Sequence, residues 1–290
     1  MKKFILYIVV IIGAAAFTSC EKVIDLNVPV GDPVPYIDAW ITDKPGPQQI
    51  KFLKAVGYLD NSAPPAISDA IIKVTDLTIS QTYDFTYNNG AYTHDPGAGV
   101  AIGVVGHEYK LSITWQGETF EAKDKLNRVP PVDSITVEYK EEKGGEKEGY
   151  YAKFFAKDLV GATDYYWIRT YRNGVINQNV SEMWSIDGAY YEDANSDGFN
   201  FIVPIREGIT SEEKPYLKGD EVKVVVRGIS KDAHGFIRLL ADQLANGGLF
   251  AKVLANVPTN VATQKQGSSN KILGWFGTVS ESELSKKIED

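Results

Sequence analysis

Short runs of β-forming residues, separated by turn signals, constrain the fold of this chain more than any other feature. Between residues 36 and 127, runs such as Tyr36–Ile41 and Thr82–Tyr87 alternate in polarity and end at turn residues. The tripeptide Asn88-Asn89-Gly90 is typical of a tight hairpin, because both central positions of a type I′ turn need a positive φ. About seven strands at this spacing predict a β-sandwich of the immunoglobulin or transthyretin type over residues 36–128.

A second domain is predicted after Pro130-Pro131, because paired prolines cannot donate hydrogen bonds to a sheet. We expect a second β-sandwich over residues 132–280, with strands that include residues 164–171 and 199–205. One helix is expected near residues 231–246, where Ser230 or Asp232 can cap the first turn and apolar residues recur at helical spacing. A charged tail, residues 281–290, follows the last expected strand, residues 271–277. The predicted fold class is therefore all-β, with two β-sandwich domains and one helix in the second.

The N-terminus has the pattern of a lipoprotein signal peptide. Lys2 and Lys3 precede an apolar stretch, Phe4–Phe17, which is too short to span a membrane and ends in small residues before Cys20. Cys20 is the only cysteine, and a lipid on its thiol would account for an unpaired cysteine in an exported chain. We expect residues 1–19 to be removed, Cys20 to carry the lipid, and residues 20–35 to form a proline-punctuated tether. The alternatives are an ordinary signal peptide, in which Cys20 is incidental, and an uncleaved anchor.

The charge of the mature chain argues against two classes of partner. Loss of Lys2 and Lys3 leaves 28 basic residues against 38 acidic ones, a net charge of about −10. Nucleic acids and anionic headgroups both attract basic patches. We therefore expect no nucleic-acid partner, and attachment to the membrane through the lipid alone.

One short motif resembles a calcium-binding loop. Asp193, Asn195 and Asp197 alternate along the chain and are followed by Gly198, as in the first half of such a loop. The bidentate glutamate expected at position twelve is replaced by Pro204. Calcium is kept as a weak candidate cofactor, and the alternative is a turn in which these side chains bond their own backbone.

No pattern of catalytic residues stands out. His94, His107 and His234 have no metal-ligand spacing, no GxSxG motif occurs, and Ser268 and Lys271 have Ser-x-x-Lys spacing without the KTG motif that accompanies it in penicillin-binding proteins. No pair of carboxylates is marked for glycoside hydrolysis. We therefore predict no catalytic residues and a chain that is not an enzyme.

Aromatic residues are the remaining functional signal. Trp184, Tyr190 and Tyr191 fall in a long segment, residues 183–199, that is interpreted as a loop. Exposed tryptophan and tyrosine on a loop favour contact with a partner or a ligand, whereas aromatic residues on strands are more often core. These three residues are the predicted contact site.

A set of motifs in a fixed order resembles a known family of outer-membrane lipoproteins from Bacteroidota, catalogued as domain of unknown function 4249. The motifs are Cys20–Leu26, Tyr36–Thr42, Ile67–Ala70, Gly90–Tyr92, Leu217–Val222, Asn256–Asn260 and Ile272–Gly277. The resemblance implies an outer-membrane lipoprotein, often encoded beside a TonB-dependent receptor. It implies no catalytic residues, because none are assigned in the family.

These patterns support one leading hypothesis and two alternatives. The leading hypothesis is a lipid-anchored binding or accessory module that serves a TonB-dependent transporter in the uptake of a nutrient, with the periplasmic or surface face left open. A lipid anchor raises the effective concentration at the membrane, so weak contacts can suffice. The alternatives are an envelope hydrolase acting on glycan or peptide, which needs paired carboxylates or a metal in a cleft, and a surface adhesin or structural module.

Overall fold

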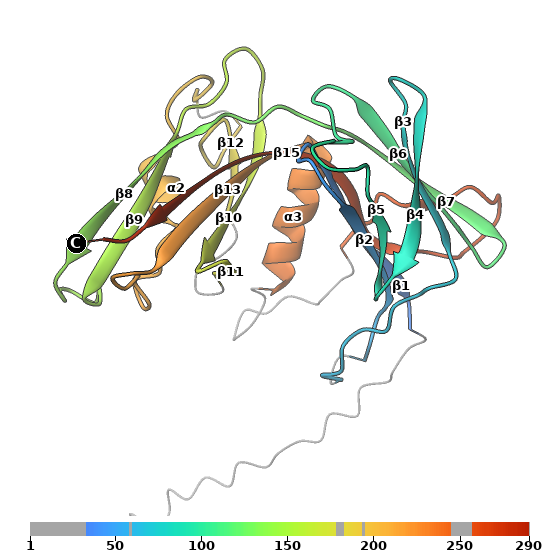
Figure 1. Ribbon diagram of the computed structural model, residues 1–290, viewed down its shortest axis with the longest axis horizontal. Helices are drawn as coiled ribbons and strands as arrows, with labels where there is room; N and C mark the ends of the chain where they lie inside the picture. The colour runs from blue at the N-terminus through green and yellow to red at the C-terminus, as the bar shows by residue number, and fades with distance from the viewer. Residues whose placement is uncertain (1–32, 58–59, 178–182, 193–194, 245–256, 290) are drawn as a thin grey trace, which may run out of the picture. The chain divides into compact units, whose positions relative to one another are not determined.

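The computed structural model describes residues 33–57, 60–177, 183–192, 195–244 and 257–289. One compact unit is formed by Pro33–Val56 with Ser62–Asp290, and all described strands and helices lie in it (Figure 1). A second unit combines Met1–Asp32 with Gly57–Asn61, and only Gly57, Asp60 and Asn61 of that unit are described.

The first group of strands forms a two-layered sandwich around a single core. Its strands are β1 (Pro35–Thr42), β2 (Gln48–Lys54), β3 (Ile71–Asp76), β4 (Gln81–Asn88), β5 (Ala91–His94), β6 (Glu108–Trp115), β7 (Glu118–Lys125) and β14 (Ala262–Thr263). Neighbours along the sheet follow the order β1-β2-β5-β4-β3-β6-β7-β14. Side chains from both layers, including Ile37, Phe52, Val74 and Leu111, are buried together. The alternation read from the sequence therefore produces one apolar face on each layer.

One hairpin of this sandwich forms at the predicted turn, and another forms at a turn with the same backbone geometry. Asn89 and Gly90 both have positive φ, 47° and 91°, and join β4 to β5. Gln116 and Gly117 do the same between β6 and β7, with φ of 49° and 75°. The all-β prediction is confirmed, and these turns fix the register of the strands that they join.

A second group of strands encloses its own core. Its strands are β8 (Val132–Lys140), β9 (Gly149–Ala156), β10 (Tyr165–Arg172), β11 (Val175–Ile176), β12 (Met183–Ile186), β13 (Glu221–Ile229) and β15 (Leu273–Lys287). The β8–β9 ribbon forms a separate two-stranded sheet. Phe154 on β9, Tyr166 on β10 and Val224 on β13 meet in this core.

The last strand, β15, takes part in both groups. Its first half pairs in parallel with β1, from Leu273 opposite Tyr36 to Val279 opposite Thr42. Its second half pairs antiparallel with β13, from Ser280 to Lys287 (Figure 1).

The expected charged tail is therefore part of β15 as far as Lys287. Two of its acids are paired across the sheet, Glu281 with Arg227 at 2.6 Å and Glu283 with Lys223 at 2.7 Å. The charges in this segment thus mark a strand with a polar face.

Residues 199–205 are not a strand, contrary to the sequence prediction. The segment contains a short helix, α2 (Val203–Glu207), with proline in its first turn. Pro204 cannot donate a ladder hydrogen bond, whereas its fixed φ and missing N–H suit the start of a helix. Ile205, the buried residue of α2, packs into the second core.

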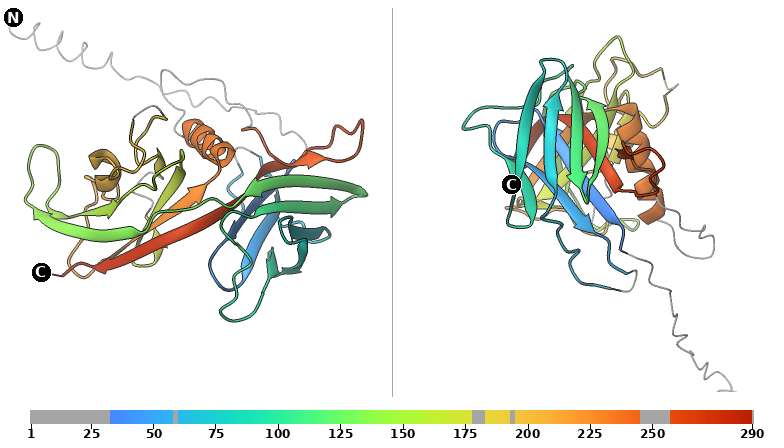
Figure 2. Two further views of the ribbon diagram at one scale, coloured as in Figure 1. Left: turned by 90° about the horizontal axis from the view of Figure 1, so that it is seen from above. Right: turned by 90° about the vertical axis from the view of Figure 1, so that its right-hand side faces the viewer.

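The predicted long helix is present as α3 (Lys231–Leu244), and residues 245–246 lie outside the described residues. Ser230 caps it, because its hydroxyl accepts a hydrogen bond from the Ala233 N–H at 3.2 Å. The buried face of α3 packs against β10 and β15, on the face of the sheet opposite the second core (Figure 2). Among the described residues, no helix is both long and apolar enough to cross a bilayer.

Candidate functional site

A cavity of about 780 Å³ lies between α3 and the sheet formed by β1, β10, β12 and β15. Four of the five tryptophans of the chain line it. Its aromatic lining consists of Tyr36, Trp40, Trp167, Trp184, Phe236 and Trp275. Its aliphatic lining consists of Ile37, Ile237, Leu240, Ala241 and Leu244. A volume of this size and a mostly apolar lining are typical of sites for small organic molecules. We call it the tryptophan cavity.

Two glycines of β15 allow a tryptophan ring and the backbone of β1 to lie close to this strand. The Trp40 ring covers Gly277, where an added Cβ would meet a ring atom at 2.2 Å. At Gly274, φ is +87° and an added Cβ would lie 1.9 Å from the carbonyl oxygen of Ile37. The Gly-Trp-Phe-Gly sequence of β15 therefore shapes one wall of the cavity through the absence of two side chains.

The aromatic side chains are held in defined pairs. The rings of Phe236 and Trp275 are stacked, with centroids 4.8 Å apart and an interplanar angle of 21°. Trp40 and Trp167 are tilted, with centroids 5.1 Å apart. The Arg227 guanidinium lies 4.9 Å from the centre of the Trp167 ring. Such contacts fix ring orientation and make the walls of the cavity rigid.

β10 contributes to this site because both of its faces are covered. The sequence favours a half-buried strand, with alternate side chains in a core. In the structure Tyr166 and Ile168 enter the second core, while Tyr165 and Trp167 face α3. One face of β10 therefore packs in the second core, and the other face forms part of the cavity wall.

Few polar groups line the cavity. Trp275 is only 8% exposed, and its Nε1–H has no hydrogen-bond partner in the part of the chain that the structure describes. Asp38 on β1 and Asp242 on α3 are exposed, and they are the only charged residues among the described residues of the lining. Burial and the neighbouring charge of Asp38 raise the pKa of the Tyr36 hydroxyl, so this phenol remains neutral near pH 7. An unpaired buried donor is costly, so an acceptor that reached this N–H would remove that cost.

A second cluster contains three buried aspartates. Asp158, Asp164 and Asp187 each offer a carboxylate oxygen, and these oxygens lie within 4.8 Å of one another. Among the described residues, these three form the group of ligand-type side chains that lie close enough together to hold a metal ion. We call them the aspartate cluster.

Protein groups already satisfy the aspartate cluster. Arg128 donates to Asp164 from Nε and Nη2, the latter at 2.6 Å. Asp158 accepts hydrogen bonds from the Tyr166 hydroxyl at 2.5 Å and the Gly198 N–H at 2.9 Å. The Asp164 N–H donates to Asp187 at 2.6 Å. These bonds tie distant loops together, as expected of a structural hub.

Burial raises the pKa of two members of this cluster above the ordinary aspartate value. For Asp164, burial raises the pKa more than the hydrogen bonds and charge of Arg128 lower it. For Asp187, burial and the neighbouring carboxylates raise the pKa, while the hydrogen bond from the Asp164 backbone opposes the shift. The charged forms of Asp164 and Asp187 are therefore less favourable here than they would be in water.

The predicted calcium motif is only partly within the described residues. Asp193 lies outside them. Asn195 is exposed, with φ of +56°, and the Asp197 carboxylate accepts a hydrogen bond from the Gly161 N–H at 2.9 Å. Asp197 thus braces a neighbouring loop, and Asn195 and Asp197 are not part of the group of potential metal ligands.

The three histidines occupy separate places. His94 Nδ1 lies 2.9 Å from the carbonyl oxygen of Asp84, and His107 Nδ1 lies 2.7 Å from the carboxylate of Asp76. His234 is buried against the Tyr165 ring, and burial lowers its pKa to about 4. The structure does not bring the histidines together.

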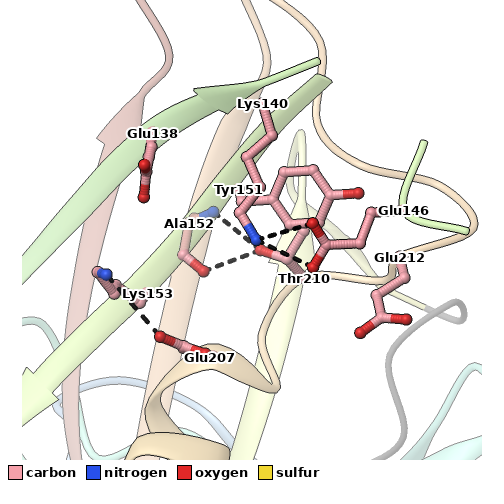
Figure 3. A pocket seen from close by; sticks show the side chains of 9 residues that line it. All are labelled: Glu138, Lys140, Glu146, Tyr151, Ala152, Lys153, Glu207, Thr210 and Glu212. Carbon is pink, nitrogen blue, oxygen red and sulfur yellow. Dashed lines mark hydrogen bonds and ion pairs between the residues drawn. The ribbon is translucent and has the colours of Figure 1, made fainter. Parts of the chain in front are cut away.

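A small polar pocket of about 120 Å³ lies beside β8, β9 and α2 (Figure 3). Four glutamates and two lysines line it, and the lysines form ion pairs, Lys140 with Glu146 at 3.1 Å and Lys153 with Glu207 at 3.8 Å. Thr210 bridges to the backbone of Ala152. Its size and internal charge pairing make it a weaker candidate than the tryptophan cavity.

The structure separates the three predicted contact residues. Trp184 lies on β12, beside Trp167 in the neighbouring strand, and lines the cavity. Tyr190 and Tyr191 are 40% and 77% exposed and are not part of the lining. Trp40, Trp167 and Trp275 were not predicted to be site residues, because aromatic residues on strands more often belong to a hydrophobic core. Cys20, the predicted lipidation site, lies outside the described residues.

Fold and cavity together define an all-β protein with a cavity lined by aromatic residues. Residues 21–285 match the model of the family described as Domain of unknown function (DUF4249), and the chain belongs to this family. No curated protein matches the sequence.

Proposed function

We propose that this chain is a cell-envelope lipoprotein that binds a small molecule and serves a TonB-dependent outer-membrane transporter in nutrient uptake. The observation that carries the binding role is the tryptophan cavity, with its unpartnered buried donor at Trp275. Rigid aromatic walls and few polar groups are what a site for a small organic ligand needs.

The N-terminal pattern supports the location. An apolar stretch that ends in small residues before Cys20 fits cleavage and lipidation at that cysteine. Attachment by two or three acyl chains would hold the protein stably at a membrane. In this proposal the membrane is the outer membrane of a member of the Bacteroidota, and Cys20 is the mature N-terminus.

The exposed tyrosines after β12 support a partner surface. Tyr191 is 77% exposed, and Tyr190, beside it, is 40% exposed. Tyrosine is enriched at protein interfaces because it combines a large apolar ring with a polar tip. We assign the contact with the transporter to this short segment.

The test is co-purification of the native lipoprotein from detergent-solubilised outer membranes. We expect wild type and Tyr139→Ala, a control at an exposed tyrosine on β8, to recover a TonB-dependent transporter. Tyr191→Ala should recover much less of it. Absence of a transporter from the wild-type sample would contradict the proposed partnership, and mass spectrometry showing an unmodified Cys20 would contradict the anchor.

A further inference from the structure

The charge of the tryptophan cavity indicates the charge of its ligand. Asp38 on β1 and Asp242 on α3 approach it from opposite elements, and no basic residue is among its described lining residues. A bound anion would face two carboxylates without a cation among these lining residues. A cation would gain from both, and from the tryptophan faces that the guanidinium groups of Arg169 and Arg227, each about 5 Å from the Trp167 ring centre, leave open.

The walls define the body of the ligand. Stacked and tilted rings, together with side chains such as Ile237 and Leu240, provide flat apolar surface. A polyhydroxylated ligand would leave most of its hydroxyl groups without partners there, which is costly inside an apolar site. A flat aromatic body fits this lining better, because it buries apolar area and stacks on the indoles.

The buried Nε1–H of Trp275 specifies one further group. It has no partner among the described residues, and the indole is 8% exposed. The nitrogen itself has almost no accessible surface, so a hydrogen-bond acceptor on the ligand would satisfy it once the surrounding side chains move aside. An acceptor placed between the aromatic body and the positive charge would use both features of the cavity.

We propose that the tryptophan cavity binds an aromatic organic cation that carries a hydrogen-bond acceptor. This inference rests on the proposed binding function and adds the chemical class of the ligand to it. Trp275 positions the acceptor, and Asp38 and Asp242 select the positive charge.

Three matched probes test this inference by isothermal titration calorimetry on the lipid-free full-length body, Cys20→Ser without residues 1–19. The probes are the 2-naphthamides of ethylenediamine, ethanolamine and β-alanine. They share the aromatic body and the amide carbonyl and differ in charge: positive, neutral and negative. We expect a Kd for the amine about tenfold below that of the alcohol, and weaker binding still for the acid.

Variants assign the selectivity to named groups. Asp38→Asn and Asp242→Asn should each reduce the preference for the amine over the alcohol by about threefold, as expected of partly solvated charge pairs. Trp275→Phe keeps the aromatic ring, removes the donor, and should weaken all three probes by about fivefold. Asp133→Asn, at an exposed carboxylate on β8 outside the cavity, should change none of these values.

The possible results separate the two proposals. Equal binding of all three probes, tighter binding of the acid, or a charge preference that survives both aspartate substitutions would overturn the cationic ligand while leaving the cavity as a binding site. Failure of all three probes to bind the folded protein would overturn the small-molecule site itself. Neither result depends on recovery of the transporter.

Discussion

The tryptophan cavity and the aspartate cluster are both conspicuous concentrations of side-chain chemistry, and they differ in how completely their polar groups are satisfied. At the aspartate cluster, Arg128, Tyr166 and backbone N–H groups bind the carboxylates. At the cavity, the Trp275 donor has no partner among the described residues, and two exposed aspartates are among the lining residues. Buried polar groups in proteins are nearly always paired, so the unpaired one is the more informative.

This difference separates a structural role from a binding role. Satisfied polar groups stabilise the loops that carry them, and their removal should lower the free energy of unfolding. Groups that face a cavity make few bonds within the fold, so their removal should change ligand affinity and leave stability nearly unchanged.

The largest effect is expected from Arg128→Ala. It leaves the buried Asp164 carboxylate without its cationic partner and removes hydrogen bonds to the carbonyls of Leu159 and Val160. Removing one partner of a buried ion pair costs several kcal/mol of stability. We expect the free energy of unfolding to fall by about 3 kcal/mol, because the guanidinium is partly exposed. Urea denaturation followed by tryptophan fluorescence measures the loss.

The comparison also predicts what Arg128→Ala does not change. At temperatures where the variant is folded, its affinity for the naphthamide probes should equal that of wild type. A large loss of affinity would mean that the cluster and the cavity are coupled, and the separation of roles would be wrong.

Gly277→Ala should damage the cavity itself. An added Cβ would lie 2.2 Å from the Trp40 ring, so the indole must move away from β15. Overpacking of this kind costs about 1–3 kcal/mol, and displacement of Trp40 should weaken the binding of every probe. Denaturation and calorimetry on the same sample would record both effects.

Gly235→Ala is the matched substitution on α3. It should change the free energy of unfolding by less than Gly277→Ala does, and in the opposite direction. An added Cβ at this position meets no atom within 4 Å, and the residue lies inside a helix. Alanine is favoured over glycine there by about 1 kcal/mol, so the variant should be more stable with unchanged probe affinity. A destabilised Gly235→Ala variant would contradict the packing described for α3.

The smallest effect is a pH dependence at the aspartate cluster. Because the folded-state pKa of Asp187 is raised, its contribution to stability is present below about pH 3.8 and is lost as the pH rises through the folded value. Asp187→Asn removes this titration and retains an oxygen that can accept the hydrogen bond from Asp164. Relative to wild type, the variant should therefore gain stability between about pH 4 and pH 7. A difference in unfolding free energy that stays constant over this range would show that Asp187 does not titrate as described.

Local signals in the sequence were enough to predict the parts of the fold that depend on neighbouring residues. Asn89 and Gly90 specify a hairpin through their own backbone preferences, and Ser230 specifies the start of α3. The mistaken strand at residues 199–205 ignored a local signal that was present, since Pro204 interrupts a ladder and suits a helix start.

The cavity could not be predicted in the same way. Trp40, Trp167 and Trp275 come from three distant segments, and they are brought together by the pairing of β15 with β1 and β13, by the pairing of β13 with β10, and by the packing of α3. Trp184 was proposed as a contact residue because it was placed on a loop, yet it lies on β12. The sequence identified one wall of the site and gave no means of finding the others.

The double pairing of β15 has a consequence for the order of events during biosynthesis. β1 lies near the start of the body, yet its parallel neighbour is made among the last residues of the chain. Contacts that close such long loops form slowly, because their entropic cost is incurred before any pairing is gained. A chain made from its N-terminus would therefore need β15 before either group of strands is complete. Premature stop codons or C-terminal trimming should then be as damaging to the N-terminal sandwich as to the rest of the body.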